Sequence, residues 1–330
     1  MIGRDGCQLP EVLWSEPMRT VVQHEFGGPE VLAIEERPAP EPIPTEIQVR
    51  VRAAGVNPVD CKSRRGRGVA PVLGDPPFCL GWDVSGVVSA VAPGVTRFKV
   101  GEEVFGMPWF PREAAAYAEY VTAPSRHFEH KPAVLSHEQA GALPLVALTA
   151  WQVIVDTVQV QEGDDVLIHG AAGGVGHLAV QIAKARGAKV IGTARSEQTE
   201  MLTALGADRV IDYRDEAFDE LVSDLDAVVD CQGSSGERSL SVLRPGGMLV
   251  SIPSGVSKDL LDAATAANRR ATGFLVEPDP VGLAGLCRLA EAGHLEVHVD
   301  RVFDLEQVGE AHRLAEASHG GGKIVLRVAS

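Results

Sequence analysis

A glycine-rich segment near the middle of this 330-residue chain constrains the fold more than any other feature. An apolar run at residues 166–169 precedes it, and a helical period over residues 175–186 follows it. A tight turn between a strand and a helix brings free backbone amides and the positive end of the helix dipole close to a pyrophosphate. The segment reads A-x-G-x-x-G, since Ala171 stands where the usual motif has its first glycine. This context predicts a dinucleotide-binding loop formed by Ala172, Gly173, Gly174, Val175 and Gly176.

Strand-like and helix-like segments alternate after this loop. Strands are expected at residues 166–169, 189–193, 209–213, 227–231 and 248–252, and helices at residues 175–186 and 196–205. Alternation at this spacing is typical of a doubly wound parallel sheet of the Rossmann type. The part of the chain that carries the glycine loop is therefore expected to be a nucleotide-binding domain.

The first 140 residues have a different sequence pattern, with few helical periods. Short valine-rich runs bounded by glycine or proline predict a small barrel or sandwich with strands at residues 19–24, 47–54, 84–91 and 103–107. A helix is expected to start after Ser136, because Gln139 completes a capping box. In the C-terminal part of the chain, the pattern predicts helices at residues 281–292 and 305–317 and strands at residues 296–303 and 323–328. The expected fold class is α/β, with a β-rich domain beside a doubly wound sheet.

Composition excludes several functions. The chain has 45 acidic and 30 basic residues and a net charge of −15, so it is a poor candidate for binding nucleic acid or anionic membranes. The longest uncharged stretch, residues 139–155, is shorter than the roughly 20 residues of a membrane span and is expected to be a buried helix. Residues 1–17 lack the apolar core of a signal peptide and are expected to be a disordered extension.

Cysteine and histidine usage gives no sign of a metal site. The five cysteines have no CxxC spacing, which argues against a disulfide framework or a zinc knuckle and favours the cytoplasm. His127, His130 and His137 lie close in sequence without thiolate partners, and we expect them to be solvated. We therefore expect no metal.

The end of the second expected strand indicates which nicotinamide cofactor binds. A site that prefers NAD carries Asp or Glu about 20 residues after the loop, where it binds the ribose 2′-hydroxyl. This chain has Arg195 and Ser196 there, which suit a 2′-phosphate and favour NADPH. The alternative is that Arg195 is an ordinary exposed arginine and Ser196 only caps the next helix.

A basic stretch follows Cys61, with Lys62, Arg64, Arg65 and Arg67. These charges could lower the pKa of the thiol, or favour an anionic group on the substrate. The alternatives are a small residue that begins a helix and a solvated basic loop.

Several segments in the same order resemble the zinc-free quinone oxidoreductase (zeta-crystallin-like) branch of the medium-chain dehydrogenase/reductase superfamily. The likeness extends from Met18 to Val328 and rests on residues 26–32, 53–60, 81–88, 148–151, 171–176, 205–208 and 322–326. The resemblance implies a GroES-like catalytic domain at residues 18–140 and 277–330, and a Rossmann NADP-binding domain at residues 141–276. Asn57 and Gly81-Trp82-Asp83 stand where zinc-dependent relatives carry metal ligands.

This resemblance implies hydride transfer from NADPH to a quinone or to the β-carbon of an α,β-unsaturated carbonyl compound. Negative charge then develops on the carbonyl oxygen and needs a hydrogen-bond donor. The matching positions are Asn57 as donor, Thr149 beside the nicotinamide and Asp60 as organiser of the loop. Tyr213 and Lys323 match positions near the adenosine phosphate, and the remaining cofactor positions are Thr193, Ile252, Phe274 and Leu275.

Two other functions stay open. The protein could be an enoyl-thioester reductase of a biosynthetic pathway, although Gly68 stands where some such relatives carry a tyrosine. It could also be a structural or regulatory protein that binds NADPH with little turnover. The resemblance further implies a homodimer that pairs through residues 248–276.

Overall fold

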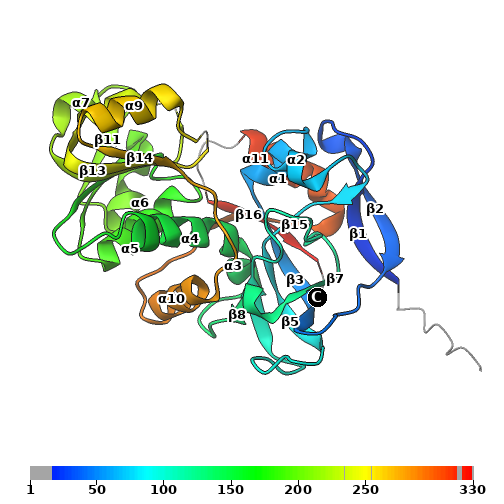
Figure 1. Ribbon diagram of the computed structural model, residues 1–330. Coiled ribbons are helices and arrows are strands. Elements are labelled where there is room, and N and C mark those ends of the chain that lie inside the picture. The colour runs from blue at the N-terminus through cyan, green and yellow to red at the C-terminus, as the bar shows by residue number, and fades with distance from the viewer. Residues whose placement is uncertain (1–16, 234, 254, 318–321, 329–330) are drawn as a thin grey trace, which may run out of the picture.

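The computed structural model describes residues 17–233, 235–253, 255–317 and 322–328, and these form two lobes side by side (Figure 1). One lobe is built on a parallel sheet and the other on mixed and antiparallel sheets. The expected extension at residues 1–17 lies outside the described residues except for Pro17, which belongs to the first strand.

The parallel sheet confirms the predicted doubly wound architecture. Its strand order is β11-β10-β9-β12-β13-β14, and all neighbours are parallel. The strands are β9 (Asp165–His169), β10 (Lys189–Ala194), β11 (Arg209–Asp212), β12 (Leu225–Asp230), β13 (Leu243–Ser251) and β14 (Arg270–Gly273). The chain proceeds from β9 toward one edge and from β12 toward the other, so the order reverses between them. Ligands of such sheets bind in the crevice at that reversal.

Short helices connect these strands. They are α5 (Gly176–Ala185), η4 (Ser196–Gln198), α6 (Thr199–Ala204), α7 (Phe218–Leu221), α8 (Gly236–Ser241) and α9 (Lys258–Ala266). Helix α5 buries most of its length against β9 and β10, because apolar residues recur at helical spacing from Leu178 to Ile182.

The other lobe has two sheets. The smaller one has the order β2-β1-β4, from β1 (Pro17–Gln23), β2 (Leu32–Pro38) and β4 (Phe78–Cys79). The larger one has the order β15-β16-β3-β5-β6-β8, with β7 also paired to β3. Its strands are β3 (Glu46–Val56), β5 (Val84–Val91), β6 (Glu103–Gly106), β7 (Tyr120–Pro124), β8 (Phe128–His130), β15 (Val299–Asp304) and β16 (Lys323–Arg327).

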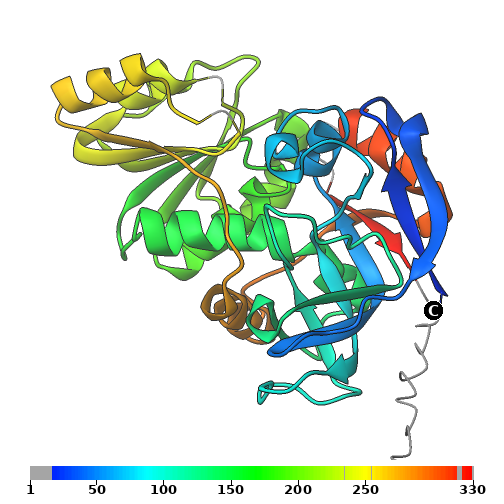
Figure 2. The ribbon, with the colours of Figure 1, turned by 45° about the vertical axis from the view of Figure 1, so that its right-hand side comes forward.

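The C-terminal strand β16 completes this larger sheet. In Figure 2 it is the red arrow within this lobe. It pairs antiparallel with β3, with Ile324 opposite Val56. Helix α1 (Pro58–Arg64) follows β3 directly, and α11 (Val308–Ala317) precedes the end of the chain. The remaining short elements of this lobe are η1 (Pro29–Val31), α2 (Ala70–Leu73), η2 (Ser125–His127) and η5 (Leu305–Gln307).

Helices between the lobes correct one prediction. The single buried helix expected at residues 139–155 is three segments, α3 (His137–Ala142), α4 (Pro144–Trp151) and a π-helical turn η3 (Gln152–Thr157). Pro144 cannot donate a backbone hydrogen bond, and the N–H of Leu145 donates to Asp83 Oδ1 at 2.6 Å instead of continuing α3. The predicted capping box is confirmed, with the N–H of Ser136 bound to Gln139 Oε1 at 3.0 Å.

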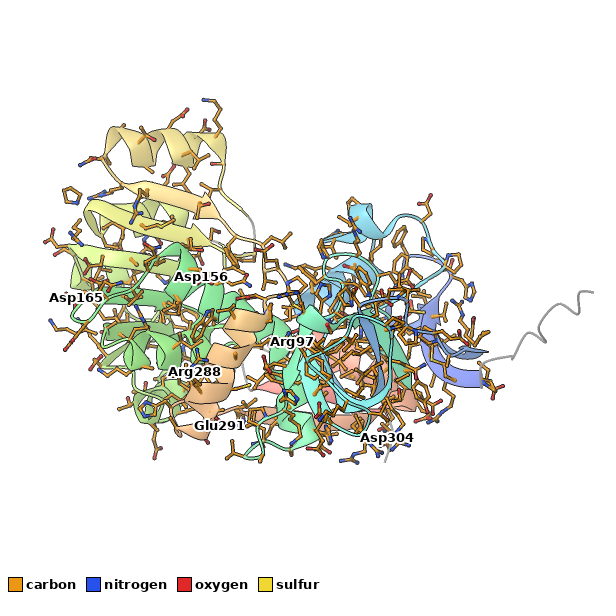
Figure 3. All side chains as sticks on the ribbon, turned by 60° about the horizontal axis from the view of Figure 1, so that its bottom comes forward. Arg97, Asp156, Asp165, Arg288, Glu291 and Asp304 are labelled. Atoms are coloured by element: carbon orange, nitrogen blue, oxygen red, sulfur yellow. The ribbon has the colours of Figure 1, made fainter. Side chains whose placement is uncertain are left out.

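Helix α10 (Pro280–Glu291) packs against α4 and β8 at the border of the two lobes. Figure 3 shows it there, with Arg288 and Glu291 labelled on it and Arg97 on the neighbouring lobe. Gly285 makes this packing possible, because a Cβ at this position would lie 2.2 Å from the ring of Trp151. Among the described residues no helix is long and apolar enough to cross a membrane.

Candidate cofactor cleft and active site

A cleft of about 310 Å³ lies where the two lobes meet. The parallel-sheet lobe lines it with Gly170, Gly173, Gly174, Val175, Gly176, Cys231, Gln232 and Ile252. The opposite wall is lined by Val56, Pro58, Val146, Ala315, Gly322, Lys323 and Ile324. The first set follows the carboxyl ends of β9, β12 and β13, which is the crevice where the strand order reverses.

The glycines of the loop differ in what surrounds them. A Cβ at Gly176 would lie 2.2 Å from the carbonyl oxygen of Gly170, so this glycine is required for the close approach of helix and strand. A Cβ at Gly173 would meet only that same oxygen, at 3.2 Å, because the position faces the cleft. The loop is therefore bare on the side where a pyrophosphate would bind, and its residues fit a dinucleotide.

Thr193 lies beneath this loop. Its hydroxyl is 3.1 Å from Nδ1 of His169 and accepts the N–H of Gly170 at 3.3 Å. The other ring nitrogen of His169 is 3.1 Å from the hydroxyl of Ser239, and burial lowers the pKa of His169 to about 4. A neutral imidazole therefore connects β9, β10 and α8, and Thr193 supports the loop from below.

The predicted 2′-phosphate residues lie at the carboxyl ends of β10 and β11. The N–H of Ser196 donates to Asp212 Oδ2 at 2.7 Å, and its hydroxyl accepts from Arg214 Nη2 at 3.0 Å. Arg214 also pairs with Asp212 at 2.7 Å and holds the pKa of that carboxyl well below its usual range. The Tyr213 side chain is 52% exposed beside them, and Arg195 immediately precedes Ser196.

A buried polar network forms the opposite wall. Asn57 Nδ2 donates to Asp83 Oδ2 at 2.8 Å, while Asn57 Oδ1 accepts from Lys323 Nζ. Lys323 Nζ also donates to the Val56 carbonyl oxygen at 3.2 Å and lies 3.6 Å from Asp83 Oδ2. A cation on one side and a carboxylate on the other leave only one orientation for the Asn57 amide.

Asp60 and Tyr117 extend this buried network. The N–H of Asn57 donates to Asp60 Oδ2 at 2.6 Å. Burial raises the pKa of Asp60 to about 7, with Asp83 adding to the rise and the N–H of Asn57 opposing it. Burial also raises the pKa of Tyr117, next to Asp60, and Gly81 (φ +94°) leaves space for the Tyr117 ring.

Comparisons with known proteins agree with this geometry. Residues 43–133 match the family model for the alcohol dehydrogenase GroES-like domain, and residues 205–326 match the model for zinc-binding dehydrogenases. The chain is 33% identical over 322 residues to an NADPH-dependent alkenal/one oxidoreductase, chloroplastic, of Arabidopsis thaliana, covering 94% of this chain and 79% of the relative.

Two solved structures are similar over almost the whole chain. The quinone oxidoreductase from Coxiella burnetii is 37% identical with a TM-score of 0.89, covering 95% of this chain and all of that one. The Escherichia coli quinone oxidoreductase complexed with NADPH is 29% identical with a TM-score of 0.83, covering 94% of this chain and all of that one. The chain belongs to the zinc-free quinone oxidoreductase branch of the medium-chain dehydrogenase/reductase superfamily.

Lys323 lies on the wall of the cleft that faces the glycine loop. The pairing of β16 with β3 places Nζ in the Asn57 network, and the role of Lys323 near the adenosine phosphate stays a prediction. Its stem faces the loop, since a Cβ at Gly174 would lie 3.6 Å from Lys323 Cδ. Burial lowers the pKa of Lys323, and Asp83 opposes that shift.

The other predicted positions are only partly brought together. Ile252 lines the cleft, whereas Phe274 and the 62% exposed Leu275 follow β14 and are not among its lining residues. Thr149 is buried in α4, where its hydroxyl donates to the Leu145 carbonyl oxygen at 2.6 Å. Asn57 and Asp60 are wholly buried behind Val56 and Pro58. The roles of all six residues in cofactor or substrate binding stay predictions.

Sequence reasoning missed Asp83, Tyr117 and Arg214 as parts of the site. Arg214 directly follows Tyr213 at the end of a predicted strand, so a basic residue beside Arg195 and Ser196 was a readable signal. Asp83 was noted only as a replaced metal ligand. Nothing in the sequence near Tyr117 indicated that its hydroxyl lies next to Asp60.

The basic stretch behaves differently from its sequence interpretation. Burial raises the pKa of Cys61 to about 12, so the neighbouring cations do not activate the thiol. Arg64 is wholly buried and pairs with Glu316 at 2.5 Å. Lys62, Arg65 and Arg67 stay exposed.

The expectation that the three clustered histidines are solvated is wrong for His127 and His137. The N–H of Trp109 donates to His127 Nδ1 at 3.1 Å, and His137 Nδ1 is 2.9 Å from the Ser85 hydroxyl. Burial lowers the pKa of both histidines. Within residues 17–233, 235–253, 255–317 and 322–328, no three His, Cys, Asp or Glu side chains are grouped so that they could hold a metal ion.

Proposed function

We propose that the protein is an NADPH-dependent oxidoreductase that reduces quinones and the β-carbon of α,β-unsaturated carbonyl compounds. The observation that carries the proposal is the bare glycine loop, which faces the buried Asn57–Asp83–Lys323 network across one cleft. The names of the Arabidopsis and Escherichia coli relatives support both the cofactor and the acceptor classes.

The chain offers separate places for the parts of the cofactor. Residues 173–176 would hold the pyrophosphate, with the N-terminus of α5 directed at its charge. Arg195, Ser196, Tyr213 and Arg214 would hold the 2′-phosphate, since guanidinium groups bind phosphate through paired N–H donors. When bound, NADPH supplies a hydride to an electron-poor acceptor.

The opposite wall would orient the acceptor. Lys323 and Asp83 hold the Asn57 amide in one orientation, and Lys323 itself lines the cleft, so Asn57 would act on the acceptor through this wall. Val56, Pro58, Val146 and Ile252 give the cleft apolar surfaces that exclude water. Because Asp60 is wholly buried, we assign protonation of the reduced product to water and the positioning of α1 to Asp60.

The proposal includes a homodimer in the cytoplasm. Among the strands that the structure describes, β14 is the last of the parallel sheet on one side, so its outer edge would pair with a second copy. Cys61, Cys79, Cys231 and Cys287 are free thiols, which suits a reducing compartment.

The decisive experiment follows consumption of NADPH by the purified protein with matched quinones, enones and enoyl thioesters, with NADH in parallel. We expect turnover of at least one quinone or enone and a clear preference for NADPH. Tight NADPH binding without turnover of any acceptor would contradict the proposal and favour a binding protein.

A further inference from the structure

A second cavity, of about 270 Å³, lies next to the cofactor cleft. Its lining residues are Pro58, Cys61, Lys62, Arg65, Arg67, Ala315 and Glu316. Pro58 and Ala315 line both cavities, so the two adjoin each other. The flexible tail of a molecule whose reactive end lies in the cleft therefore has this basic pocket next to it.

Local structure brings the basic residues together. The pocket lies between α1 and α11, which are packed side by side in both ribbon views (Figures 1 and 2). After α1 the chain turns tightly, and the N–H groups of Arg65 and Arg67 both donate to the carbonyl oxygen of Lys62, at 3.1 and 2.8 Å. Three cationic side chains thus start from one short turn.

Arg64 anchors this turn from the inside. Its guanidinium donates to the Gly27 carbonyl oxygen at 3.2 Å, to His312 Nδ1 at 2.8 Å and to Glu316 Oε1 at 2.5 Å. Because Arg64 is wholly buried, it is unavailable to a ligand. Its contacts hold the turn against α11, so the neighbouring cations extend from a rigid support.

The charge of the pocket is positive. Glu316 is its one lining carboxylate, and its two oxygens pair with Arg64 at 2.5 Å and with Arg65 at 3.0 Å. Neither Lys62 nor Arg67 makes an ion pair in the part of the chain that the structure describes. With Glu316 balanced by Arg64, Lys62, Arg65 and Arg67 leave a local excess of positive charge in a chain of net charge −15.

We propose that this basic pocket binds a phosphate group on the substrate, and that the preferred substrates are α,β-unsaturated thioesters with a phosphate at the end of a flexible chain. The inference rests on the proposed reductase function. Two guanidinium groups and an ammonium match the charge and the several acceptor oxygens of a phosphate. The residues proposed for the cofactor phosphate lie at the start of η4 and in the turn after β11, in the other lobe, so this pocket is free for the substrate.

The kinetic test compares crotonyl-coenzyme A with crotonyl-N-acetylcysteamine, a thioester of the same acid without phosphate, using NADPH-saturated protein. We expect a kcat/KM ratio that favours the phosphate-bearing thioester by at least about tenfold, with an advantage that shrinks as salt is added. The variant Arg65→Gln/Arg67→Gln should lower that ratio by about 10- to 100-fold, since each removed cation is a charge-assisted donor.

Arg126→Gln is the matched control, because Arg126 is an exposed arginine of the same lobe on η2. It should leave the ratio within about twofold of the parent. Equal kcat/KM for the two thioesters, or an equal drop of the ratio in the control, would overturn the proposal.

A binding measurement decides the pocket independently of turnover. Calorimetry with pantetheine 4′-phosphate and with pantetheine should show tighter binding of the phosphate by about tenfold or more, and Arg65→Gln/Arg67→Gln should remove the difference. If the protein reduces none of the acceptors with NADPH, the proposed function fails. The calorimetric comparison still decides whether the pocket binds phosphate. Loss of the NADPH over NADH preference in the variant would place the cofactor phosphate in the pocket and overturn the proposal.

Discussion

Lys323 Nζ on β16 lies 3.6 Å from Asp83 Oδ2, and both side chains are almost completely buried, at 4% and 0% exposure. The whole parallel-sheet lobe lies between the two residues in the chain, and the amide of Asn57 is bound to both. Burial raises the pKa of Asp83 and lowers that of Lys323, and each charge opposes the shift of the other. The wall of the active site therefore depends on one buried ion pair, in which each residue stays charged because of the other.

Removing one partner of this pair should destabilise the fold. Asp83→Asn leaves the Lys323 ammonium buried without its counter-ion, at an expected loss of about 3–5 kcal/mol in the free energy of unfolding. The double variant Asp83→Asn/Lys323→Met should recover part of that loss in guanidinium denaturation. The control Lys258→Met breaks an exposed pair with Asp262 and should lose less than about 1 kcal/mol. Additive losses in the double variant would show that the pair is not coupled.

Two glycines of the loop should respond in opposite ways. Gly173→Val adds a side chain on the open cleft, so Tm should stay within about 4 °C while the Kd for NADPH rises at least about 100-fold. Gly176→Ala forces its Cβ to within 2.2 Å of a carbonyl oxygen and should lower Tm strongly before any cofactor is added. Fluorescence titration and thermal unfolding separate the two effects. Unchanged NADPH affinity in Gly173→Val would contradict the loop assignment.

Loss of the predicted 2′-phosphate residues should change the choice of cofactor. Arg195→Ala should raise the Kd for NADPH at least about tenfold more than the Kd for NADH, because a charge-assisted hydrogen bond is lost. Arg214→Ala should have the same direction, since Arg214 orients the Ser196 hydroxyl. Arg209→Ala at the start of β11 is the control, as its guanidinium donates to the Leu221 carbonyl oxygen. Equal losses for both cofactors would remove the proposed role.

Asn57 should affect turnover more than cofactor binding. Asn57→Ala removes the amide between Lys323 and Asp83, and we expect kcat at saturating NADPH to fall about 10- to 100-fold. The KM for NADPH should change less than about threefold, which a general loss of structure would not produce. Steady-state kinetics with one quinone and one enone provide the measurement. Full activity would show that the carbonyl oxygen is stabilised elsewhere.

His312 should contribute to acid sensitivity. Burial lowers its pKa to about 3, and Arg64 Nη1 donates to its Nδ1 at 2.8 Å, so the folded protein requires the neutral ring. The contribution of the neutral His312 ring to the free energy of unfolding is complete above pH 6.5. It is lost as the pH falls below that value, because His312 in the unfolded chain binds a proton at a higher pH than in the folded protein. His312→Gln should flatten the pH dependence of unfolding free energy near pH 5 by about 1.4 kcal/mol per pH unit. The exposed His294→Gln is the control, and an identical slope in both variants would contradict this assignment.

Local patterns explain why much of the fold could be predicted from the sequence. The parallel sheet follows from the alternation of strand and helix, and the glycine loop combines a local spacing with a local backbone requirement. Gly176 could be assigned to close helix packing without any tertiary information. The Ser136 capping box is also local, since both partners lie within one turn.

The parts that were missed depend on distant segments. The contact of Lys323 with Asn57 could not be predicted, because it is decided by the antiparallel pairing of β16 with β3, which no local pattern encodes. His127 and His137 were expected to be solvated because their loops look polar, yet neighbouring segments bury them in part. The division of the helix at Pro144 is coupled to the Asp83 carboxylate, which comes from another strand.

The pairing of β16 with β3 also sets an order of assembly. Domains emerging from the ribosome fold from the N-terminus onward, but β3 must wait for a strand that is synthesised after the whole parallel-sheet lobe. Until that strand arrives, Asp83 and Asn57 have no lysine to bind, and the wall of the cleft is incomplete. The nucleotide lobe can therefore form its own sheet first, whereas the capacity for catalysis is acquired in the last step of folding.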